Sequence, residues 1–245
     1  MKVSISLGGS LLTKNMEAAT YRRYADVIRR LWEAGHTVVV TCGGGRPARQ
    51  FISIAKELDG SRELQDSLGI LATHVNALLL IAALGDAADP HIHRRATEIK
   101  SHLGDRILVG GGHRPGSSTD YRAAIFAEAI DADLIINATD VPGVYDKNPK
   151  TNPDAKKLDT ITYTELEKII KANTRQAPGE YGLFDLKAVR LAAKLGTPIV
   201  FVDGTDPEEI ICAITGAHHG TTVRPLESNV YMQLSDNQDV RGRSR

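Results

Sequence analysis

Residues 4–10 read SISLGGS: serines alternate with apolar residues up to Leu7, and two glycines and a serine follow. The alternation predicts a short strand over residues 2–7, and the glycines predict a tight turn at its end. Such a turn can simply redirect the chain, or its backbone N–H groups can hold a phosphate. A phosphate loop usually has a cation nearby, but Ser6 stands at the expected position, two residues before Gly8.

Strands and helices alternate along the rest of the chain. A second apolar run, TVVVTC, occupies residues 37–42, and residues 17–34 before it have the apolar spacing of a helix, which predicts a βαβ unit. The same reasoning predicts further strands at 106–109, 133–138 and 198–202, and helices over 47–58, 63–84, 120–131, 162–172, 185–195 and 207–215. This alternation predicts an α/β fold with helices on the faces of a parallel sheet.

The composition excludes several classes of protein. The 245 residues carry 30 Lys plus Arg and 30 Asp plus Glu, so the formal net charge is zero. A nucleic-acid or acidic-membrane partner requires a positive field and therefore has no support. The apolar run NALLLIAALG at residues 76–85 is shorter than the roughly 20 residues that cross a bilayer. We expect no membrane partner and, without a visible secretion signal, a cytoplasmic protein.

The chain shows no internal repeat and no long Pro- or Ser-rich linker. We therefore expect a single domain over residues 1–225. Residues 226–245 lose the apolar periodicity and end in RGRSR, so we expect a partly disordered C-terminal tail.

Three predicted strands run directly into glycines, at residues 8–9, 43–45 and 110–112. The carboxyl ends of parallel strands lie at one edge of a sheet, and ligands bind at that edge. Each cluster by itself could be only a tight turn, but three at one edge favour an anion site. None matches the P-loop or the dinucleotide-binding pattern, so a phosphate site here would be of another kind.

Charged residues follow two of the glycine clusters. Arg46 and Arg49 lie three apart in the first turn of a predicted helix, where both can point to the loop and bind phosphate, unless they are surface arginines. Asp120 ends the stretch HRPGSSTD at 113–120, at the start of another predicted helix. The pattern fits equally a helix cap and a carboxylate that orients a magnesium-bound or attacking group.

Other candidate residues give weaker signals. The Asn-, Asp- and Pro-rich stretch after the strand at 133–138 is a surface loop by composition, although Tyr145 would offer a nucleobase a flat face. We predict no metal site within the chain. His91, His93 and the doublet at 218–219 have no third ligand at a suitable spacing, and we expect exposed loop positions for them.

Five segments of the chain resemble the amino-acid-kinase superfamily and, within it, the UMP kinases of the archaeal and bacterial kind. The resemblance runs from about residue 2 to residue 225. The DxxGxxATxxN pattern of the third segment is the discriminating one, because it resembles the UMP-binding helix of these kinases. The segments are LGGSLL (7–12), CGGGRPARQF (42–51), DSLGILATHVNALLL (66–80), GGGHRPGSSTDYRAA (110–124) and NATDVPGVYDKNPKTNPDAKKLDTITYTEL (137–166).

The resemblance implies a three-layer α/β/α sandwich with a mostly parallel central sheet. ATP and UMP would lie end to end along its carboxyl edge, and the reaction would convert ATP and UMP into ADP and UDP. Mg²⁺ would accompany ATP, and the protein would form a homo-oligomer, usually a hexamer.

The resemblance also implies roles for individual residues. The carboxylate of Asp66 would take the ribose hydroxyls of UMP. The other expected UMP contacts are Gly44, Arg114, Pro115, Gly116, Ser117, Ser118, Thr119 and Asp120. The expected contacts with the transferring phosphate and the ATP tail are Gly8, Gly9, Ser10, Gly45 and Arg49. The adenosine pocket would be lined by Thr139, Tyr145 and Asn148, and the catalytic candidates are Gly9, Arg49, Asp120 and Lys187.

Ser6 departs from the family pattern, because many members have a lysine there that bridges the phosphates. Lys187 and Lys14 are candidates to supply the charge, although Lys14 fits a solvated surface position better. Two other functions stay open. One is a same-fold kinase for another small acceptor, such as isopentenyl phosphate or an acylated amino acid. The other is a non-catalytic nucleotide- or oxyanion-binding protein of the molybdenum-storage type.

Overall fold

The structure is a computed structural model that describes residues 1–149, 151–173 and 184–225. The strands are β1 (Lys2–Leu7), β2 (Thr37–Cys42), β3 (Ala88–His93), β4 (Ile107–Gly110), β5 (Leu134–Thr139), β6 (Thr160–Thr162), β7 (Ile199–Asp203) and β8 (Thr221–Arg224). The helices are α1 (Gly9–Leu12), α2 (Ala18–Glu33), α3 (Gly45–Glu57), α4 (Arg62–Leu84), α5 (Ala96–Ser101), α6 (Thr119–Ile130), α7 (Tyr163–Asn173), α8 (Leu186–Leu195) and α9 (Glu208–Thr215), with a 3₁₀ turn at Gly85–Ala87.

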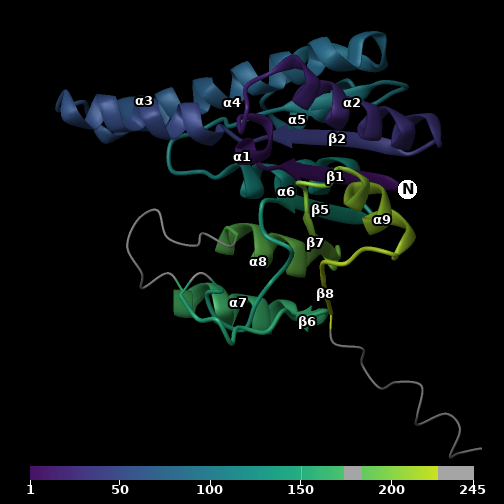
Figure 1. The fold of residues 1–245 in the computed structure, drawn as a ribbon. Helices are drawn as coiled ribbons and strands as arrows, with labels where there is room; N and C mark the ends of the chain where they lie inside the picture. The colour runs from purple at the N-terminus through teal and green to yellow at the C-terminus, as the bar shows by residue number, and fades with distance from the viewer. Residues whose placement is uncertain (150, 174–183, 226–245) are drawn as a thin grey trace, which may run out of the picture.

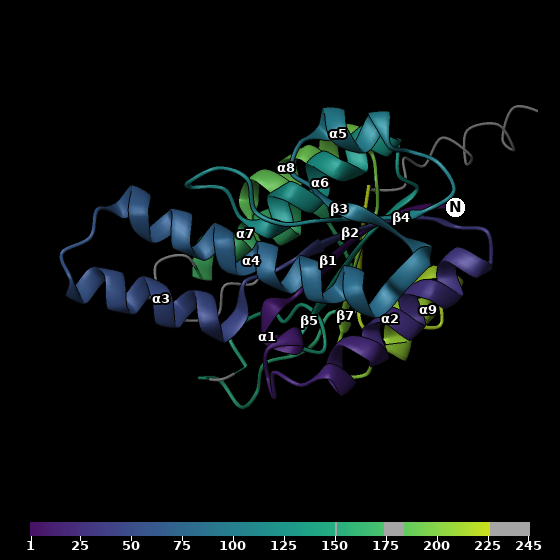
Figure 2. The same ribbon diagram turned by 90° about the horizontal axis from the view of Figure 1, so that it is seen from above.

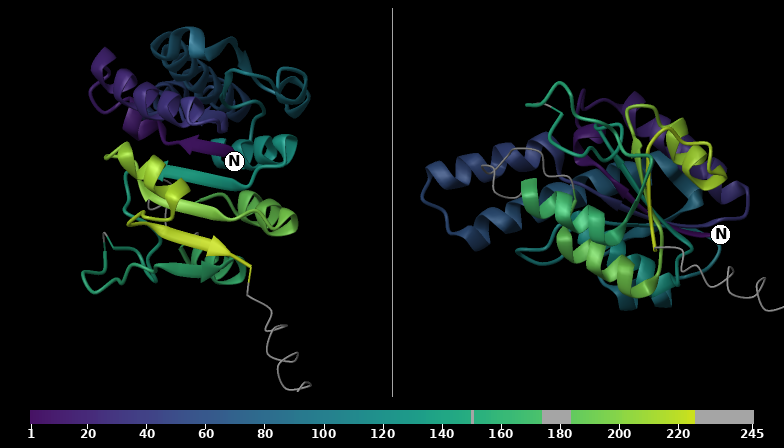
Figure 3. Two further views of the ribbon diagram at one scale, coloured as in Figure 1. Left: turned by 90° about the vertical axis from the view of Figure 1, so that its right-hand side faces the viewer. Right: turned by 90° about the horizontal axis from the view of Figure 1, so that it is seen from below.

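The strands of the described residues form one sheet in the order β3-β4-β2-β1-β5-β7-β8-β6 (Figure 3). Every neighbouring pair is parallel except β7 and β8. β1 lies at the centre, where Ser6 stands opposite Thr41 of β2 on one side and Asn137 of β5 on the other. The mostly parallel sheet that the sequence predicted is confirmed, and β1, β2 and β4 end at the same edge.

Helices cover both faces of the sheet and give three layers (Figures 1 and 2). On one face, α2, α4 and α9 pack on alternate strand residues, such as Val3, Ile5 and Leu7 of β1. On the other face, α5, α6, α7 and α8 pack on residues such as Ile135 and Phe201. α3 lies along α4, and the pair projects beyond the carboxyl edge of the sheet (Figure 2).

The serines of β1 face a helix rather than solvent. Ser4 Oγ donates a 2.8 Å hydrogen bond to the carbonyl oxygen of Ala123, and Ser6 Oγ donates one of 2.8 Å to Oδ1 of Asp120. Both partners belong to α6, and both serines are buried. The alternation in SISLGGS therefore separates an apolar face that packs on α2 and α4 from a polar face that is hydrogen-bonded to α6.

β3 and α5 did not emerge from the sequence pattern. β3 reads ADPHIH, which is poor in β-branched and aromatic residues and contains a proline, a composition that edge strands tolerate. The expectation of exposed loop histidines was wrong for part of the group: His91 and His93 lie in β3, and the His93 side chain is only 2% exposed.

One stretch passes the length and composition test for a membrane span. An 18-residue stretch within residues 62–87 has a mean hydropathy of 1.9, but α4 packs against α2, α3 and the sheet, and 44% of that stretch is buried inside the protein. A core helix of this kind passes the same test. The division into a domain over residues 1–225 and a tail stays a prediction, since residues 226–245 lie outside the described part.

Candidate functional site

The first two glycine loops interlock at the carboxyl edge of the sheet. A Cβ atom on Gly9 would lie 2.1 Å from the backbone nitrogen of Gly45 and 2.5 Å from the carbonyl carbon of Gly43. Gly45 has a φ of +65°, and a Cβ there would lie 2.2 Å from the oxygen of Gly9. The two backbones approach so closely that only glycine fits at these two positions.

Polar side chains fix this interlocked backbone. Thr13 Oγ1 donates to the Gly9 oxygen at 2.8 Å and accepts from the backbone N–H of Arg46 at 3.0 Å, so it ties α1 to α3. Asn76 of α4 donates from Nδ2 to the Gly43 oxygen at 2.7 Å, and the hydroxyl of Tyr21 holds the Asn76 amide. The geometry of the loops is therefore set by Thr13 at the end of α1 and by side chains of α2 and α4.

The third glycine loop is bound to α4. The backbone N–H of Gly112 donates to Thr73 Oγ1 at 2.7 Å, and the Gly112 oxygen lies 2.7 Å from Nε2 of His74. Four residues of α4, at positions 66, 69, 70 and 73, line a hollow of about 260 Å³ beside this loop. We call it the acceptor hollow; its other lining residues are Ile52, Gly112, Arg114, Gly116, Ser117 and Thr119.

The acceptor hollow brings together most of the residues predicted to bind UMP. Oδ2 of Asp66 accepts a 2.9 Å hydrogen bond from the backbone N–H of Gly116, which joins α4 to the loop before α6. Gly44 is the N-cap residue of α3, where a Cβ atom would contact Ala48, the carbonyl oxygen of Gly69 and Thr73. Pro115 instead lines a neighbouring hollow, and Ser118 caps α6 by accepting from the N–H of Tyr121.

The buried carboxylate of Asp120 lies between β1 and the start of α8. Its Oδ1 accepts from Ser6, while Ser118 Oγ donates at 2.5 Å to Oδ2 of Asp185 at the start of α8. Burial raises the pKa of Asp120 to about 6; the Ser6 hydrogen bond opposes this rise, and the nearby carboxylate of Asp185 adds to it. Ser118, rather than Asp120, is the N-cap of α6, so the cap alternative for Asp120 is wrong.

This carboxyl should make stability depend on pH. A carboxyl whose pKa is raised by folding holds its proton more tightly in the folded protein, so its stabilising contribution is full below pH 4 and is lost as the pH rises through about 6. The predicted loss is up to about 3 kcal/mol of unfolding free energy. Asp120→Asn should remove this pH dependence in urea unfolding between pH 4 and 8.

Two comparisons make the Asp120 measurement specific. Ser6→Ala removes the hydrogen bond to the ionised carboxylate, so it should move the transition to higher pH. Asp133→Asn changes a carboxylate that bonds the backbone of Lys2 at the opposite edge of the sheet, and it should leave the transition in place. A constant difference between wild type and Asp120→Asn across this pH range would contradict the prediction.

A second hollow on the other side of the glycine loops is lined by cations. Its volume is about 440 Å³, and Lys14, Arg23, Arg46 and Arg49 line it together with Ser10. The remaining lining residues are Leu11, Thr13, Asn15, Thr20, Tyr24, Asp140 and Thr205. We call it the cation-lined hollow. Four cations against the single carboxylate Asp140 make it suited to a polyanion.

The remaining predicted site residues are dispersed. Lys187 is the second residue of α8, which Asp185 caps, and its ammonium lies 6.0 Å from the ring centroid of Tyr121. Thr139 ends β5 next to Asp140, and Gly8 donates its N–H to the oxygen of Ala138. Tyr145 forms a β-bridge with Lys157, and Asn148 is buried. Neither is among the residues that line the two hollows.

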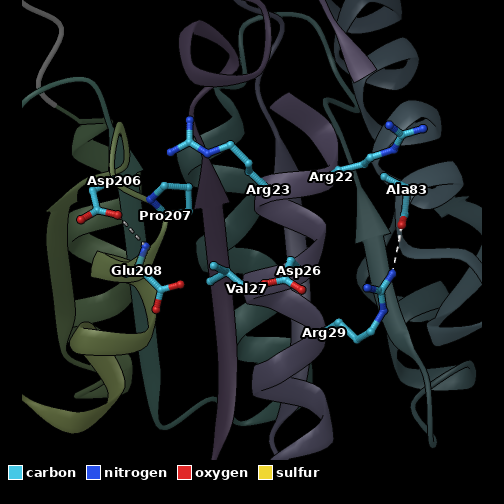
Figure 4. Close-up of a pocket in the computed structure, with 9 residues that line it drawn as sticks. All are labelled: Arg22, Arg23, Asp26, Val27, Arg29, Ala83, Asp206, Pro207 and Glu208. Carbon is cyan, nitrogen blue, oxygen red and sulfur yellow. Dashed lines mark hydrogen bonds between the residues drawn. The ribbon is translucent and has the colours of Figure 1, made fainter. Parts of the chain in front are cut away.

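A third hollow, of about 520 Å³, lies between α2 and α9 (Figure 4). It shares Arg23 with the cation-lined hollow, but its charges are balanced and partly engaged. Arg29 donates to the oxygens of Ala83 and Leu84, and Glu208 is bonded to Arg30 outside the group drawn in Figure 4. This hollow lacks the glycine loops, so it is not the candidate site.

The sequence pattern missed some of these residues. Arg23 lies in α2, the long helix after the first strand, and nothing in the sequence around it marks it as a ligand. Thr205 follows β7, which is distant in the sequence. Lys14 was expected at a solvated surface position, and its side chain is exposed, but it lies on the wall of the cation-lined hollow. The useful signal is topological, because Ser10, Asp140 and Thr205 all follow strands that end at the same edge.

Comparisons with known proteins agree with this architecture. Residues 1–203 match the amino acid kinase family. A uridylate kinase from Methanococcus maripaludis (strain C6) is 42% identical over 228 residues, which cover 92% of this chain and 100% of that protein. One from Methanothermobacter thermautotrophicus is 40% identical with the same coverage. The solved structure of uridylate kinase from Archaeoglobus fulgidus superposes with a TM-score of 0.82 at 36% identity, covering 91% of this chain and 100% of that one.

Proposed function

Because this chain belongs to the amino acid kinase family, we propose that it transfers the γ-phosphoryl group of ATP to UMP and releases ADP and UDP. The observation that carries the proposal is the acceptor hollow, in which Asp66 faces the loop before α6 beside the glycine edge. Relatives named uridylate kinase match over nine tenths of the chain, which supports the same acceptor.

The acceptor hollow is chemically suited to a nucleotide. One carboxylate oxygen of Asp66 holds Gly116, and within the described residues the other has no hydrogen-bond partner, so it can accept ribose hydroxyls. Arg114 lines the same hollow and offers a cation to the acceptor phosphate. Ile52 and Ile70 supply apolar surface for a base. We propose Gly44 and Ser117 to Asp120 as the remaining contacts.

In this proposal the cation-lined hollow takes the phosphates of ATP. The N–H groups of Gly9, Ser10 and Gly45 and the guanidinium of Arg49 would stabilise the charge on the oxygens of the moving phosphoryl group. Gly8, whose own N–H donates to Ala138, is proposed to line the same loop. Positioning supplies the rest, because phosphoryl transfer needs little covalent chemistry from the protein. Thr139, Tyr145 and Asn148 are proposed to line the adenosine site, and Lys187 is proposed as a further charge.

The residues present fit Mg²⁺ that is carried by ATP. Among the described residues no group of three or more His, Cys, Asp or Glu side chains is placed to hold a metal. Mg²⁺ in kinases is bound mainly by phosphate oxygens and one or two carboxylates. Asp140 lines the cation-lined hollow, and Asp120 is hydrogen-bonded to Ser6 of β1, so these are the carboxylates proposed to meet the ion. The ion would neutralise charge on the phosphates when bound.

A coupled assay of ADP release tests the proposed function. UMP, CMP, dCMP and isopentenyl phosphate are supplied in turn with ATP and Mg²⁺, and turnover is expected with UMP. Turnover confined to isopentenyl phosphate would assign the other kinase activity. Tight ATP binding without turnover on any acceptor would assign the binding protein of the molybdenum-storage type.

Asp66→Ala should separate binding of the two substrates. Removing the carboxylate deletes the proposed ribose contact and the bond to Gly116, so the KM for UMP should rise by at least about tenfold while that for ATP changes little. Steady-state kinetics with each substrate varied measures both. Glu63→Ala, one turn earlier on α4 and exposed, is the control. Equal increases for UMP and ATP would contradict the assignment.

We propose that the protein is a homo-oligomer, a hexamer by resemblance to its family, and that α3 and α4 form an interface. The pair projects from the rest of the protein (Figure 2). Eight large apolar side chains on the pair and at the end of α3 are exposed. Such a patch is unusual on a monomer. The residues are Phe51, Ile54, Leu58, Leu64, Leu71, Val75, Leu78 and Leu79.

The double variant Ile54→Glu with Val75→Glu should reduce the assembly mass measured by light scattering, because charges at a buried apolar interface are costly. Leu103→Glu, at an exposed apolar residue away from α3 and α4, should keep the native mass. An unchanged mass in the double variant would remove α3 and α4 from the interface. We further propose a cytoplasmic location, with small-molecule partners only.

A further inference from the structure

The side chain of Asn76 joins elements that belong to both proposed substrate hollows. It lies on α4, one turn after Thr73, and Asn76 is 3% exposed. Its Nδ2 donates a 2.7 Å hydrogen bond to the Gly43 oxygen, and its Oδ1 accepts one of 2.9 Å from the hydroxyl of Tyr21 on α2. One amide therefore connects three segments that are far apart in the sequence.

The Gly43 oxygen depends on this amide. A carbonyl at the start of a helix accepts from the N–H four residues later, but here that residue is Pro47, which has no N–H. Within the described part of the chain, the oxygen has no hydrogen-bond donor besides Asn76. Gly43 is buried, and a Cβ there would lie 2.5 Å from the nitrogen of Gly9. The bond from Asn76 therefore holds the second glycine loop against the first.

The two helices that meet at this amide each form a wall of one hollow. Four residues of α4 line the acceptor hollow, and three of α2, Thr20, Arg23 and Tyr24, line the cation-lined hollow. Asn76 and Tyr21 are among the lining residues of neither. Both are buried, and a buried amide that is hydrogen-bonded through both of its ends keeps one orientation. It thus fixes how the two walls stand relative to each other.

We propose that Asn76 is a positioning residue for phosphoryl transfer, which holds the acceptor helix α4 in register with the glycine loops so that the two substrates meet. This role rests on the proposed function, because only there does α4 hold the acceptor and the loops hold the ATP phosphates. Asn76 acts through Gly43 and Tyr21 rather than on a substrate. A displacement of about 1 Å can slow a reaction about 100-fold. Loss of the amide should therefore slow transfer more than it weakens binding.

Asn76→Leu keeps the side-chain size and removes both hydrogen bonds. Turnover per binding-competent site should fall by at least about tenfold, while the Kd values for UMP and for the β,γ-imido analogue of ATP change by less than about threefold. Isothermal titration of the full chain counts the competent sites and gives both Kd values, and the coupled assay gives turnover. Fewer competent sites with wild-type turnover at each would show a role in stability alone and contradict the proposal.

Asn76→Asp can restore the connection within one protein. A protonated carboxyl can donate to the Gly43 oxygen and accept from Tyr21, but an ionised carboxylate cannot donate. Burial beside a carbonyl oxygen should raise the pKa of the introduced carboxyl. The turnover of Asn76→Asp relative to wild type should therefore recover as the pH is lowered from about 9 to about 5, whereas that of Asn76→Leu stays low. A ratio for Asn76→Asp as low as that of Asn76→Leu at every pH would overturn the role.

The native groups near this amide do not disturb the pH comparison. Burial raises the pKa of the Tyr21 hydroxyl to about 12, and the neighbouring Cys42 adds to this rise. Burial also raises the pKa of the Cys42 thiol to about 12, so both groups stay neutral over the range measured. Asp120, whose pKa is about 6, titrates in wild type and in the variants, and its effect cancels in the ratio.

Tyr21→Phe keeps the proposal testable if the Asn76 variants do not fold. It removes one hydroxyl and leaves the bond to Gly43, so turnover per site should fall by about threefold, near the worth of one hydrogen bond. Tyr163→Phe is the matched control, because its buried hydroxyl donates at 2.7 Å to the Thr197 oxygen just before β7, at the opposite edge of the sheet. This control should keep wild-type turnover per site.

The outcomes separate the role of Asn76 from the proposed function. A wild-type protein that turns over none of the acceptors would refute the kinase activity and the positioning role with it. An active wild type whose Asn76→Leu and Tyr21→Phe variants keep full turnover per site would overturn the positioning role alone. Equal losses in Tyr21→Phe and Tyr163→Phe would also overturn it, because the effect would then follow from losing any buried hydroxyl.

Discussion

Gly9→Ala is expected to lower the unfolding free energy by about 3 kcal/mol and turnover by about 100-fold. The added Cβ would lie 2.1 Å from the nitrogen of Gly45 and within 2.7 Å of the Gly43 carbonyl, and all of these atoms are backbone. The loops can accommodate it only by moving apart, which displaces the N–H groups proposed to contact the phosphates. Urea unfolding and steady-state turnover measure the two effects.

Gly104→Ala is the matched control for Gly9→Ala. The nearest atom to its Cβ would be the His102 oxygen at 4.0 Å, and Gly104 does not have a left-handed φ. The variant should stay within about 0.5 kcal/mol of wild type. A Gly9→Ala protein with wild-type stability and turnover would show that the loops are not locked together as described.

Arg49→Ala is expected to reduce turnover by more than about tenfold, which corresponds to about 1.4 kcal/mol of lost transition-state stabilisation. Arg49 is exposed on the wall of the cation-lined hollow in the first turns of α3, so its removal should hardly affect the fold. Turnover at saturating ATP and UMP gives the transition-state effect, and the KM for ATP reports ground-state binding.

Arg106→Ala controls for the loss of one exposed arginine and should retain wild-type turnover. If Arg49→Ala also retains it, Arg49 has no part in the mechanism, and Arg23, Arg46 and Lys14 become the cations to test. A rise in KM for ATP with unchanged turnover would assign Arg49 to binding alone.

Much of the architecture was predictable because periodicity and topology are local signals. The alternation in β1 and the apolar run of β2 predicted two central strands, and the shared carboxyl edge of parallel strands predicted that three glycine loops would meet. β3 was missed because its histidines and proline carry no strand signal. An edge strand can accept such residues, since one of its sides needs no partner.

The electrostatics of the site were less predictable, because they depend on contacts between distant residues. The sequence presents Ser6 as a missing lysine, whereas the fold makes it the hydrogen-bond donor to Asp120, 114 residues away. Asp66 was expected to hold a ribose, and its bond to Gly116 could not be read from spacing.

The central position of β1 has a consequence for how the chain is synthesised. Residues 2–7 can pair with β2 as soon as residue 42 has been made, but their other side must wait for β5 at residues 134–139. Until then the nascent chain carries an open strand edge in the middle of its future sheet, and such edges invite pairing with other chains. Completing the sheet by a contact so distant in sequence should also make folding slow for a protein of this size. The N–H of Gly8 donates to Ala138 of β5, so the first glycine loop reaches its final geometry only at that late step.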